Sequence, residues 1–157
     1  MGADLYALSE RYKRYCELLD LKYSKRSQDV SQEELEKLDK EIDKIWNEMY
    51  MNYEYFRDSY NSSNLLWLLG LNYWIWFAQF MEKNSCIISA ENCKKILKIV
   101  LRRGHMITKE RIREKLEEDL GSGVDIEEWY KYFKDKYNRF IKFLERCIEC
   151  GGMEASV

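Results

Sequence analysis

The sequence predicts an all-α protein, a compact bundle of about six helices packed around one central apolar helix at residues 65–81. That stretch reads LLWLLGLNYWIWFAQFM, contains no charged residue and holds three of the five tryptophans. The segments around it are highly charged, and their apolar residues recur at three- and four-residue steps, as in amphipathic helices. The 157 residues include seven glycines and no proline, so few residues interrupt a helix.

Two amphipathic helices are expected before the central one. The first covers about residues 3–24, where leucines and tyrosines recur on one face. The second begins at Ser31, because Ser31 followed by Glu34 forms a capping box, and it is expected to end near Tyr60. Its near-heptad stripe spans about three heptads, the lower limit for a coiled coil. Aromatic residues, among them Tyr50 and Tyr53, make its later half apolar on more than one side.

The central stretch has three interpretations. A membrane span is disfavoured, because seventeen residues rise only about 25 Å against a hydrocarbon core of roughly 30 Å. A core helix surrounded by amphipathic helices fits better, since such a helix is apolar all round. If the neighbours do not cover it completely, the exposed remainder is a groove or a dimer surface. The partner-binding candidates are then the aromatic residues, which often anchor interfaces: Trp67, Trp74, Trp76, Tyr50 and Tyr53.

Three further helices are expected after the centre. Ser89 caps a helix over residues 90–103, and Thr108 caps a shorter one that ends at Leu120. Asp125 with Glu128 begins the last helix, which has the cleanest apolar stripe of the chain. No alternation typical of strands stands out. The prediction is therefore one helical domain over residues 1–150 and a frayed tail over residues 151–157.

Charge is distributed unevenly along the chain. The overall formal charge is −2, yet residues 94–115 hold nine bases and two acids. Residues 90–120 have the outline of a helix-turn-helix, in which the second helix could enter a major groove while arginines hold phosphates. The nucleic-acid-binding candidates are Arg102, Arg103, Lys109, Arg111, Arg113 and Lys115. The competing interpretation is an ordinary solvated face, because cations are favoured at a helix C-terminus and on helix surfaces.

Cys147 and Cys150 have the spacing of half a zinc site, since two thiolates two residues apart can bind one Zn²⁺. The other ligands of a full site would have to come from Cys86, Cys93 and His105, whose spacing matches no zinc pattern. The alternative is that Cys147 is a core residue of the last helix. No cofactor is predicted apart from this structural zinc.

The sequence contains no nucleophile elbow, phosphate-binding loop or dinucleotide fingerprint, and its single histidine, His105, is expected in a surface turn. Five cysteines and a start, MGADLYALSE, unlike a signal peptide predict an intracellular, cytoplasmic protein. The functional prediction is a non-enzymatic interaction module, such as an adaptor, an inhibitor or a small subunit of a complex, that binds a protein partner or a second copy of itself. The alternatives are nucleic-acid binding and a zinc-stapled helical module.

Overall fold

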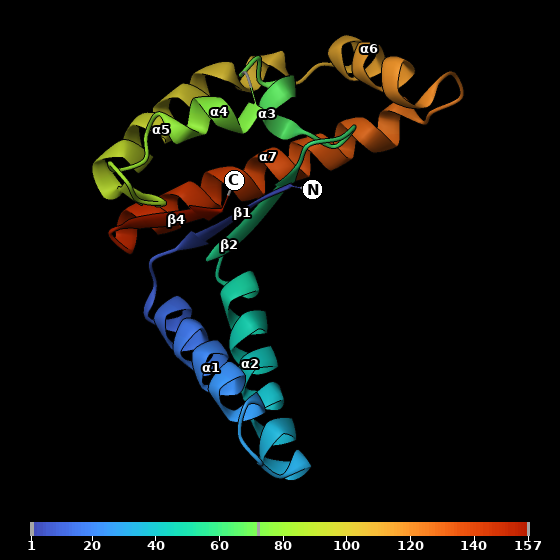
Figure 1. Cartoon of the computed structure of the whole chain (residues 1–157). Coiled ribbons are helices and arrows are strands. Elements are labelled where there is room, and N and C mark those ends of the chain that lie inside the picture. The colour runs from blue at the N-terminus through green and yellow to red at the C-terminus, as the bar shows by residue number, and fades with distance from the viewer. Residues whose placement is uncertain (1, 72, 157) are drawn as a thin grey trace.

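The structure is a computed structural model that describes residues 2–71 and 73–156, except for the side chains of residues 73 and 74. Helices and a small sheet alternate along the chain (Figure 1). The elements are, in order, β1 (Gly2–Ala7), α1 (Glu10–Arg26), α2 (Gln32–Met51), β2 (Tyr55–Ser59), α3 (Leu65–Leu68), α4 (Tyr73–Ala78), β3 (Ile87–Ser89), α5 (Ala90–Arg103), the 3-10 turn η1 (Gly104–Met106), α6 (Lys109–Leu120), α7 (Ile126–Glu149) and β4 (Gly152–Ser156).

The all-α prediction is wrong, because four strands form an antiparallel sheet in the order β2-β1-β4-β3. β1 was expected to be the start of the first helix. Ala3, Leu5 and Ala7 instead alternate with more exposed residues, and the three buried side chains face the helices. β1 pairs with β2 on one side and with β4 on the other. The backbone groups of β1 are thus satisfied by strands that come from distant parts of the sequence.

The tail expected to be frayed is strand β4, which lies between β1 and β3 inside the sheet. Its side chains Met153 and Ala155 are completely buried. Gly152 makes the entry into the strand, with a φ of +134°, and a Cβ atom there would lie 2.4 Å from the carbonyl oxygen of Ile88. Glycine is therefore required at this position, because any side chain would collide with the neighbouring strand.

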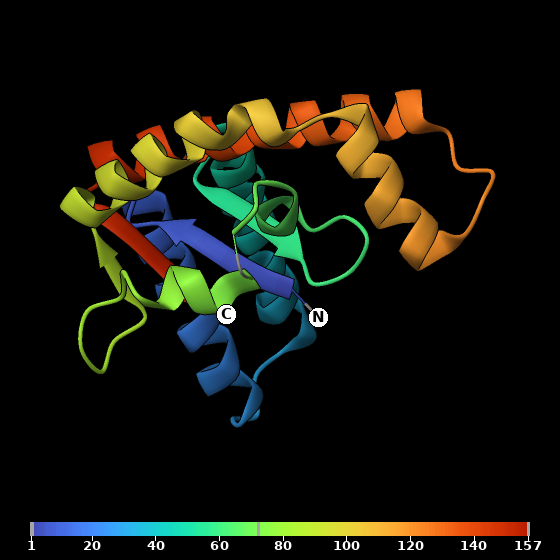
Figure 2. The same ribbon diagram turned by 90° about the horizontal axis from the view of Figure 1, so that it is seen from above.

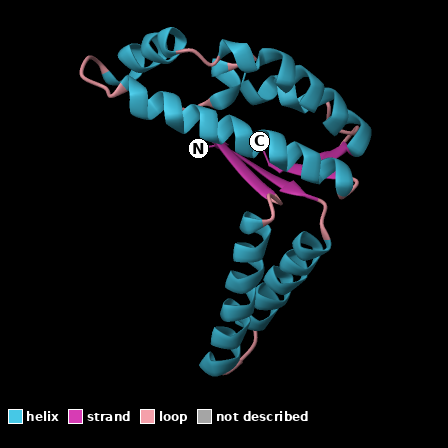
Figure 3. Cartoon of the chain, turned by 180° about the vertical axis from the view of Figure 1, so that it is seen from behind, coloured by secondary structure: helices cyan, strands magenta, loops and turns pink. Residues whose placement is uncertain are grey.

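Helices α1 and α2 form a hairpin that projects from one end of the sheet (Figures 1 and 3). The hairpin has a small hydrophobic cluster of its own, formed by Leu18, Leu38 and Ile42. The second helix ends at Met51 and not near Tyr60 as expected. Tyr53 adopts a left-handed conformation with a φ of 56°. The N–H of Glu54 donates to the carbonyl of Met49, so the chain closes the helix with a Schellman motif before it enters β2.

The main core lies between one face of the sheet and helices α5 and α7 (Figure 2). The central stretch contributes buried side chains to this core, including Leu66, Leu69 and Phe77, as the core interpretation expects. It is not one continuous helix, however, because it contains the two short helices α3 and α4 and a turn at Gly70, whose φ is +71°. Among the described residues, no helix is both long enough and apolar enough to cross a membrane.

Candidate functional site: a groove beside the edge strand

A buried ion pair fixes the edge strand β2 against α7. Lys136 on α7 donates to the Oδ1 atom of Asp58 at 2.6 Å and to the carbonyl of Ser63 at 2.7 Å. The Asp58 carboxylate is completely buried and also accepts the backbone N–H groups of Leu65 and Leu66 at the start of α3. One carboxylate thus joins β2, α3 and α7, and this junction holds the wall of the groove described next.

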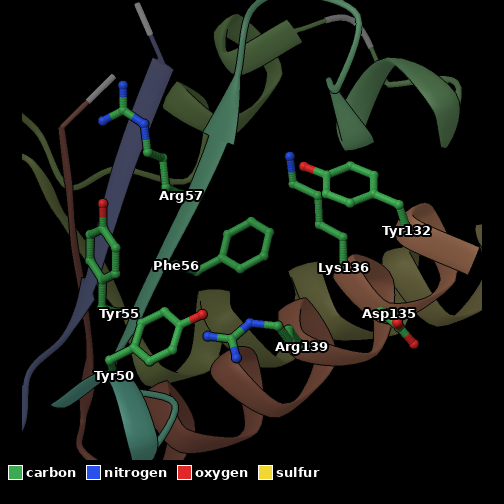
Figure 4. A pocket seen from close by; sticks show the side chains of 8 residues that line it. All are labelled: Tyr50, Tyr55, Phe56, Arg57, Tyr132, Asp135, Lys136 and Arg139. Carbon is green, nitrogen blue, oxygen red and sulfur yellow. The ribbon is translucent and has the colours of Figure 1, made fainter. Parts of the chain in front are cut away.

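A groove with a volume of about 370 Å³ runs between β2 and α7. Figure 4 shows Phe56 between the two elements, with Tyr132, Lys136 and Arg139 projecting from α7 and Tyr50 at one end. Tyr55 and Arg57 point to the other side of β2, as the alternation of a strand requires. The lining therefore combines aromatic rings with cationic groups, which is a composition typical of protein interfaces.

The outer edge of β2 faces this groove with unpaired backbone groups. The N–H of Ala7 donates to the carbonyl of Glu54 at 2.9 Å. This bond shows which of the opposing residues of β1 and β2 form hydrogen-bonded pairs, because such pairs alternate along antiparallel strands. Phe56 consequently directs its backbone groups toward β1, whereas Tyr55 and Arg57 direct theirs away from it. Within residues 2–71 and 73–156, the backbone groups of Tyr55 and Arg57 form no hydrogen bond. An edge of this kind is a template for another strand.

Arg139 supplies a cation that has no acidic partner in the described part of the chain. Its guanidinium lies 4.4 Å from the ring centroid of Tyr50 and 5.7 Å from that of Tyr53. Lys142, one turn further along α7, lies 5.0 Å from the Tyr53 ring. Lys142 also donates to the Tyr53 hydroxyl at 3.4 Å. The rings orient both cations, and the guanidinium donors of Arg139 remain available for an anionic group at the groove mouth.

The other charged groups of the groove are engaged or turned aside. Arg57 binds both carboxylate oxygens of Asp4 at 2.8 Å, and Tyr55 donates its hydroxyl proton to the same carboxylate at 2.5 Å. Burial, together with this bond to Asp4, raises the pKa of Tyr55. Asp135 also lines a neighbouring hollow beside Tyr130 and Lys134, on the other side of α7. Arg139 is consequently the cation of the groove lining that has no acidic partner among the described residues, and Lys142 lies nearby, against the Tyr53 ring.

Several of the predicted nucleic-acid-binding residues are used inside the fold. Arg111 donates from Nε and Nη2 to the carbonyl of Leu68 at 3.2 and 3.0 Å, and it thereby caps the C-terminus of α3. Arg103 likewise donates to the carbonyls of Leu69 and Gly70. Lys115 is buried, and its ammonium lies 4.7 Å from the ring centroid of Trp67. These three cations are turned toward the protein and away from a nucleic-acid surface.

The remaining members of that set lie at the surface. Arg102 and Arg113 are exposed, while Lys109 forms an ion pair with Glu127 at 2.5 Å. The two helices of the helix-turn-helix outline, α5 and α6, begin and end as expected. Nucleic-acid binding stays a prediction, and of its six candidate residues Arg102 and Arg113 are the two that are exposed.

The predicted partner-binding aromatics separate into two groups. Trp67 and Trp76 are partly buried and pack against the main core, so they serve mainly the fold. The side chain of Trp74 lies outside the described residues. Tyr50, which is 49% exposed, lines the groove, and Tyr53 lies near it with its ring 5.7 Å from the Arg139 guanidinium. The structure therefore brings together two predicted residues of α2 and its cap with cations of α7.

Cys147 and Cys150 lie in different environments. Cys147 is completely buried beside Cys93, and burial raises the pKa of its thiol well above the usual value. Cys150 is half-buried at the end of α7. A zinc ligand must be a thiolate, which burial of Cys147 disfavours. Across the described residues, no group of three or more histidine, cysteine or acidic side chains is arranged to hold a metal. Zinc binding stays a prediction.

The sequence reasoning missed the α7 side of the groove. Tyr132, Lys136 and Arg139 recur at steps of four and three residues, so they share one face of the last helix. This second, mixed stripe is a usable sequence signal, although it is weaker than the apolar stripe on the same helix. Comparisons of the chain with protein-family models, with curated proteins and with solved structures found no match.

Proposed function

We propose that this chain is a non-enzymatic interaction module that binds a protein partner in the groove between β2 and α7. The observation that carries the proposal is the placement of Arg139, a cation without an acidic partner in the described residues, against the exposed ring of Tyr50. Aromatic and arginine side chains at the mouth of a concave site are the usual anchors of protein interfaces. The proposed location is the cytoplasm.

The groove lining supports binding better than catalysis. The eight lining residues include no serine, cysteine or histidine, so the groove has no serine or cysteine nucleophile beside an imidazole base. Lys136 is held by Asp58 and the Ser63 carbonyl, and Arg57 is held by Asp4. A groove with fixed walls and rings that orient its cations is preorganised for a ligand, which lowers the entropy lost on binding.

A displayed library of random peptides tests this proposal. Selection on the folded protein should enrich peptides, and the tightest one should bind in solution when it is followed by fluorescence anisotropy. Tyr50→Ser and Arg139→Ser should each weaken that peptide by about 10-fold or more, as expected for interface anchors.

Two surface variants serve as matched controls. Tyr23→Ser and Arg113→Ser remove the same side-chain types at exposed positions on α1 and α6, away from the groove. They should leave the affinity within about 2-fold, because surface positions outside the interface contribute little. The proposal is overturned if no peptide is enriched, or if the groove variants and the controls bind alike.

A further inference from the structure

We propose that the partner binds as an extended, acidic peptide segment that adds a fifth strand to the outer edge of β2 and directs one carboxylate to Arg139. This inference rests on the proposed function and specifies how the same groove would be occupied. Two independent features support it: the unpaired backbone groups of β2 and the cations of α7 that face them across the groove.

The backbone of β2 offers four hydrogen-bonding groups to such a segment. These are the N–H and C=O groups of Tyr55 and Arg57, which point away from β1. An added strand lies about 4.8 Å from its neighbour, so it would run beside β2, along the groove that residues of β2 and α7 line. Strand addition satisfies all four groups together, as in other domains that bind peptides beside a sheet edge.

The side chains determine which peptide fits. Residues opposite each other on paired strands point to the same face of the sheet. The peptide residue opposite Phe56 therefore points into the groove, toward Tyr132 and Arg139 (Figure 4). A glutamate at this place can direct its carboxylate toward Arg139 and accept from the guanidinium. Lys142 adds a second positive charge one turn away.

A second copy of this chain fits the edge less well. The two-fold antiparallel register that pairs all five residues of β2 with their counterparts places Arg57 opposite its own copy. Like charges directly opposite each other destabilise a strand pair. It also leaves Arg139 without a carboxylate from β2, because the Asp58 carboxylate is buried against Lys136. Charge complementarity thus favours a separate acidic segment.

Methylation of single backbone nitrogens tests strand addition without changing the protein. The probe is the tightest peptide from the library selection, labelled with fluorescein and synthesised with one N-methyl group at each position in turn. The two residues opposite Tyr55 and Arg57 donate to β2, so methylation there should weaken binding by about 10-fold. The residue between them points its N–H away from β2 and should tolerate methylation. Alternating sensitivity is the expected result.

Amide hydrogen exchange of the complex gives a direct second readout. The amides of Tyr55 and Arg57 should exchange more slowly when the peptide is bound, whereas the amide of Phe56 is already protected by β1. Replacing the peptide glutamate by glutamine should weaken wild-type binding by about 10-fold and have little effect on Arg139→Gln, because the two groups form one pair. Arg113→Gln is the matched control and should keep the full glutamate preference.

The outcomes separate this inference from the proposed function. Peptides that bind through Tyr50 and Arg139 but show no alternation on methylation would overturn strand addition and leave the interaction module standing. If the peptide residue opposite Phe56 is preferably lysine and not glutamate, the proposal of an acidic partner is overturned. Dimerisation of the chain that protects Tyr55 and Arg57 without peptide would assign the edge to a second copy. Failure to enrich any peptide would overturn both proposals.

Discussion

Replacing Lys136 by methionine tests the junction on which the groove depends. Methionine keeps an unbranched side chain but removes the ammonium that bonds to Asp58 and to the Ser63 carbonyl. Asp58 would then be a completely buried carboxylate bonded only to backbone amides. Removing one partner of a buried ion pair usually destabilises a protein by about 3–5 kcal/mol, because the remaining charge is uncompensated.

Urea unfolding followed by far-UV circular dichroism measures this effect. For a domain of this size, with an m-value of about 2 kcal/mol/M, a loss of about 4 kcal/mol would lower the midpoint by about 2 M. Such a loss is a large share of a typical stability of roughly 5–15 kcal/mol. Lys131→Met, an exposed position on the same helix, is the matched control and should change stability by less than about 0.5 kcal/mol.

The double variant Asp58→Asn with Lys136→Met separates charge from packing. With both charges removed, no uncompensated charge remains, so much of the stability lost in Lys136→Met should be recovered. The sum of the stability losses of the two single variants should exceed the loss of the double variant by at least about 1 kcal/mol. A loss below about 1 kcal/mol for Lys136→Met alone would refute the reasoning, because a truly buried carboxylate cannot lose its counter-ion at so little cost.

Three further predictions address the sheet, its tyrosines and the helix cap. Gly152→Ala should lower the free energy of unfolding by about 2–4 kcal/mol, because the new Cβ atom clashes with the Ile88 carbonyl. Gly151→Ala is the control and should lower it by only about 1 kcal/mol, because the space around its Cβ atom is open. Equal losses in urea unfolding would contradict this prediction. Burial and Asp4 raise the pKa of Tyr6 from 10.0 to about 12, so the folded state retains a proton that the unfolded chain releases. Its contribution is therefore fully present below pH 10 and is lost as the pH rises through about 12, and urea midpoints should fall over this window less steeply in Tyr6→Phe than in the wild type. Tyr53→Gly should change stability by no more than about 1 kcal/mol, because the strain that glycine relieves is offset by the loss of the two cation–π contacts. Peptide affinity should fall; a larger loss of stability with unchanged affinity would refute the assignment.

The helices after residue 89 were predictable because polar side chains mark their starts. Ser89, Thr108 and Asp125 each accept the backbone N–H of the third residue of their helix, as their spacing from the first apolar residues indicated. These interactions are local, so the sequence reports them directly. The last helix also ends where its apolar stripe ends, at Glu149. The fold class was nevertheless wrong, because it depended on segments whose structure is decided elsewhere in the chain.

The strands were missed because each is short and is stabilised by distant partners. In β1, Leu5 fits the alternation of the strand, yet it also fits the helical spacing to Leu8 and Tyr12. In β2, the inward residues are Phe56 and Asp58, and a buried aspartate hides the alternation. Its burial becomes understandable only when Lys136, from the other half of the chain, is placed beside it. Pairings of this kind leave no local signal.

The groove was half visible in the sequence for the same reason. Tyr50 and Tyr53 stood out as excess aromatic residues near the end of the second helix, whereas Arg139 became interesting only when the fold placed it on their rings. No local pattern could relate residues so far apart in the chain. The residue types of a binding surface are visible in the sequence, but only the fold shows that these residues lie close together.

Tyr53 connects the misjudged helix end with the proposed function. A left-handed residue at the end of a helix is usually glycine, and a side chain with a Cβ atom there costs about 1 kcal/mol. The Tyr53 ring lies under Arg139 and Lys142, and each exposed cation–π contact contributes about 0.5–1 kcal/mol. These contacts offset the strain but yield little surplus, so the fold alone gains almost nothing from tyrosine at this position. Because the cation–π contacts of Tyr53 do little more than offset its backbone strain, stability alone does not explain a tyrosine here. Its orientation of Arg139 and Lys142 near the groove mouth is the better explanation.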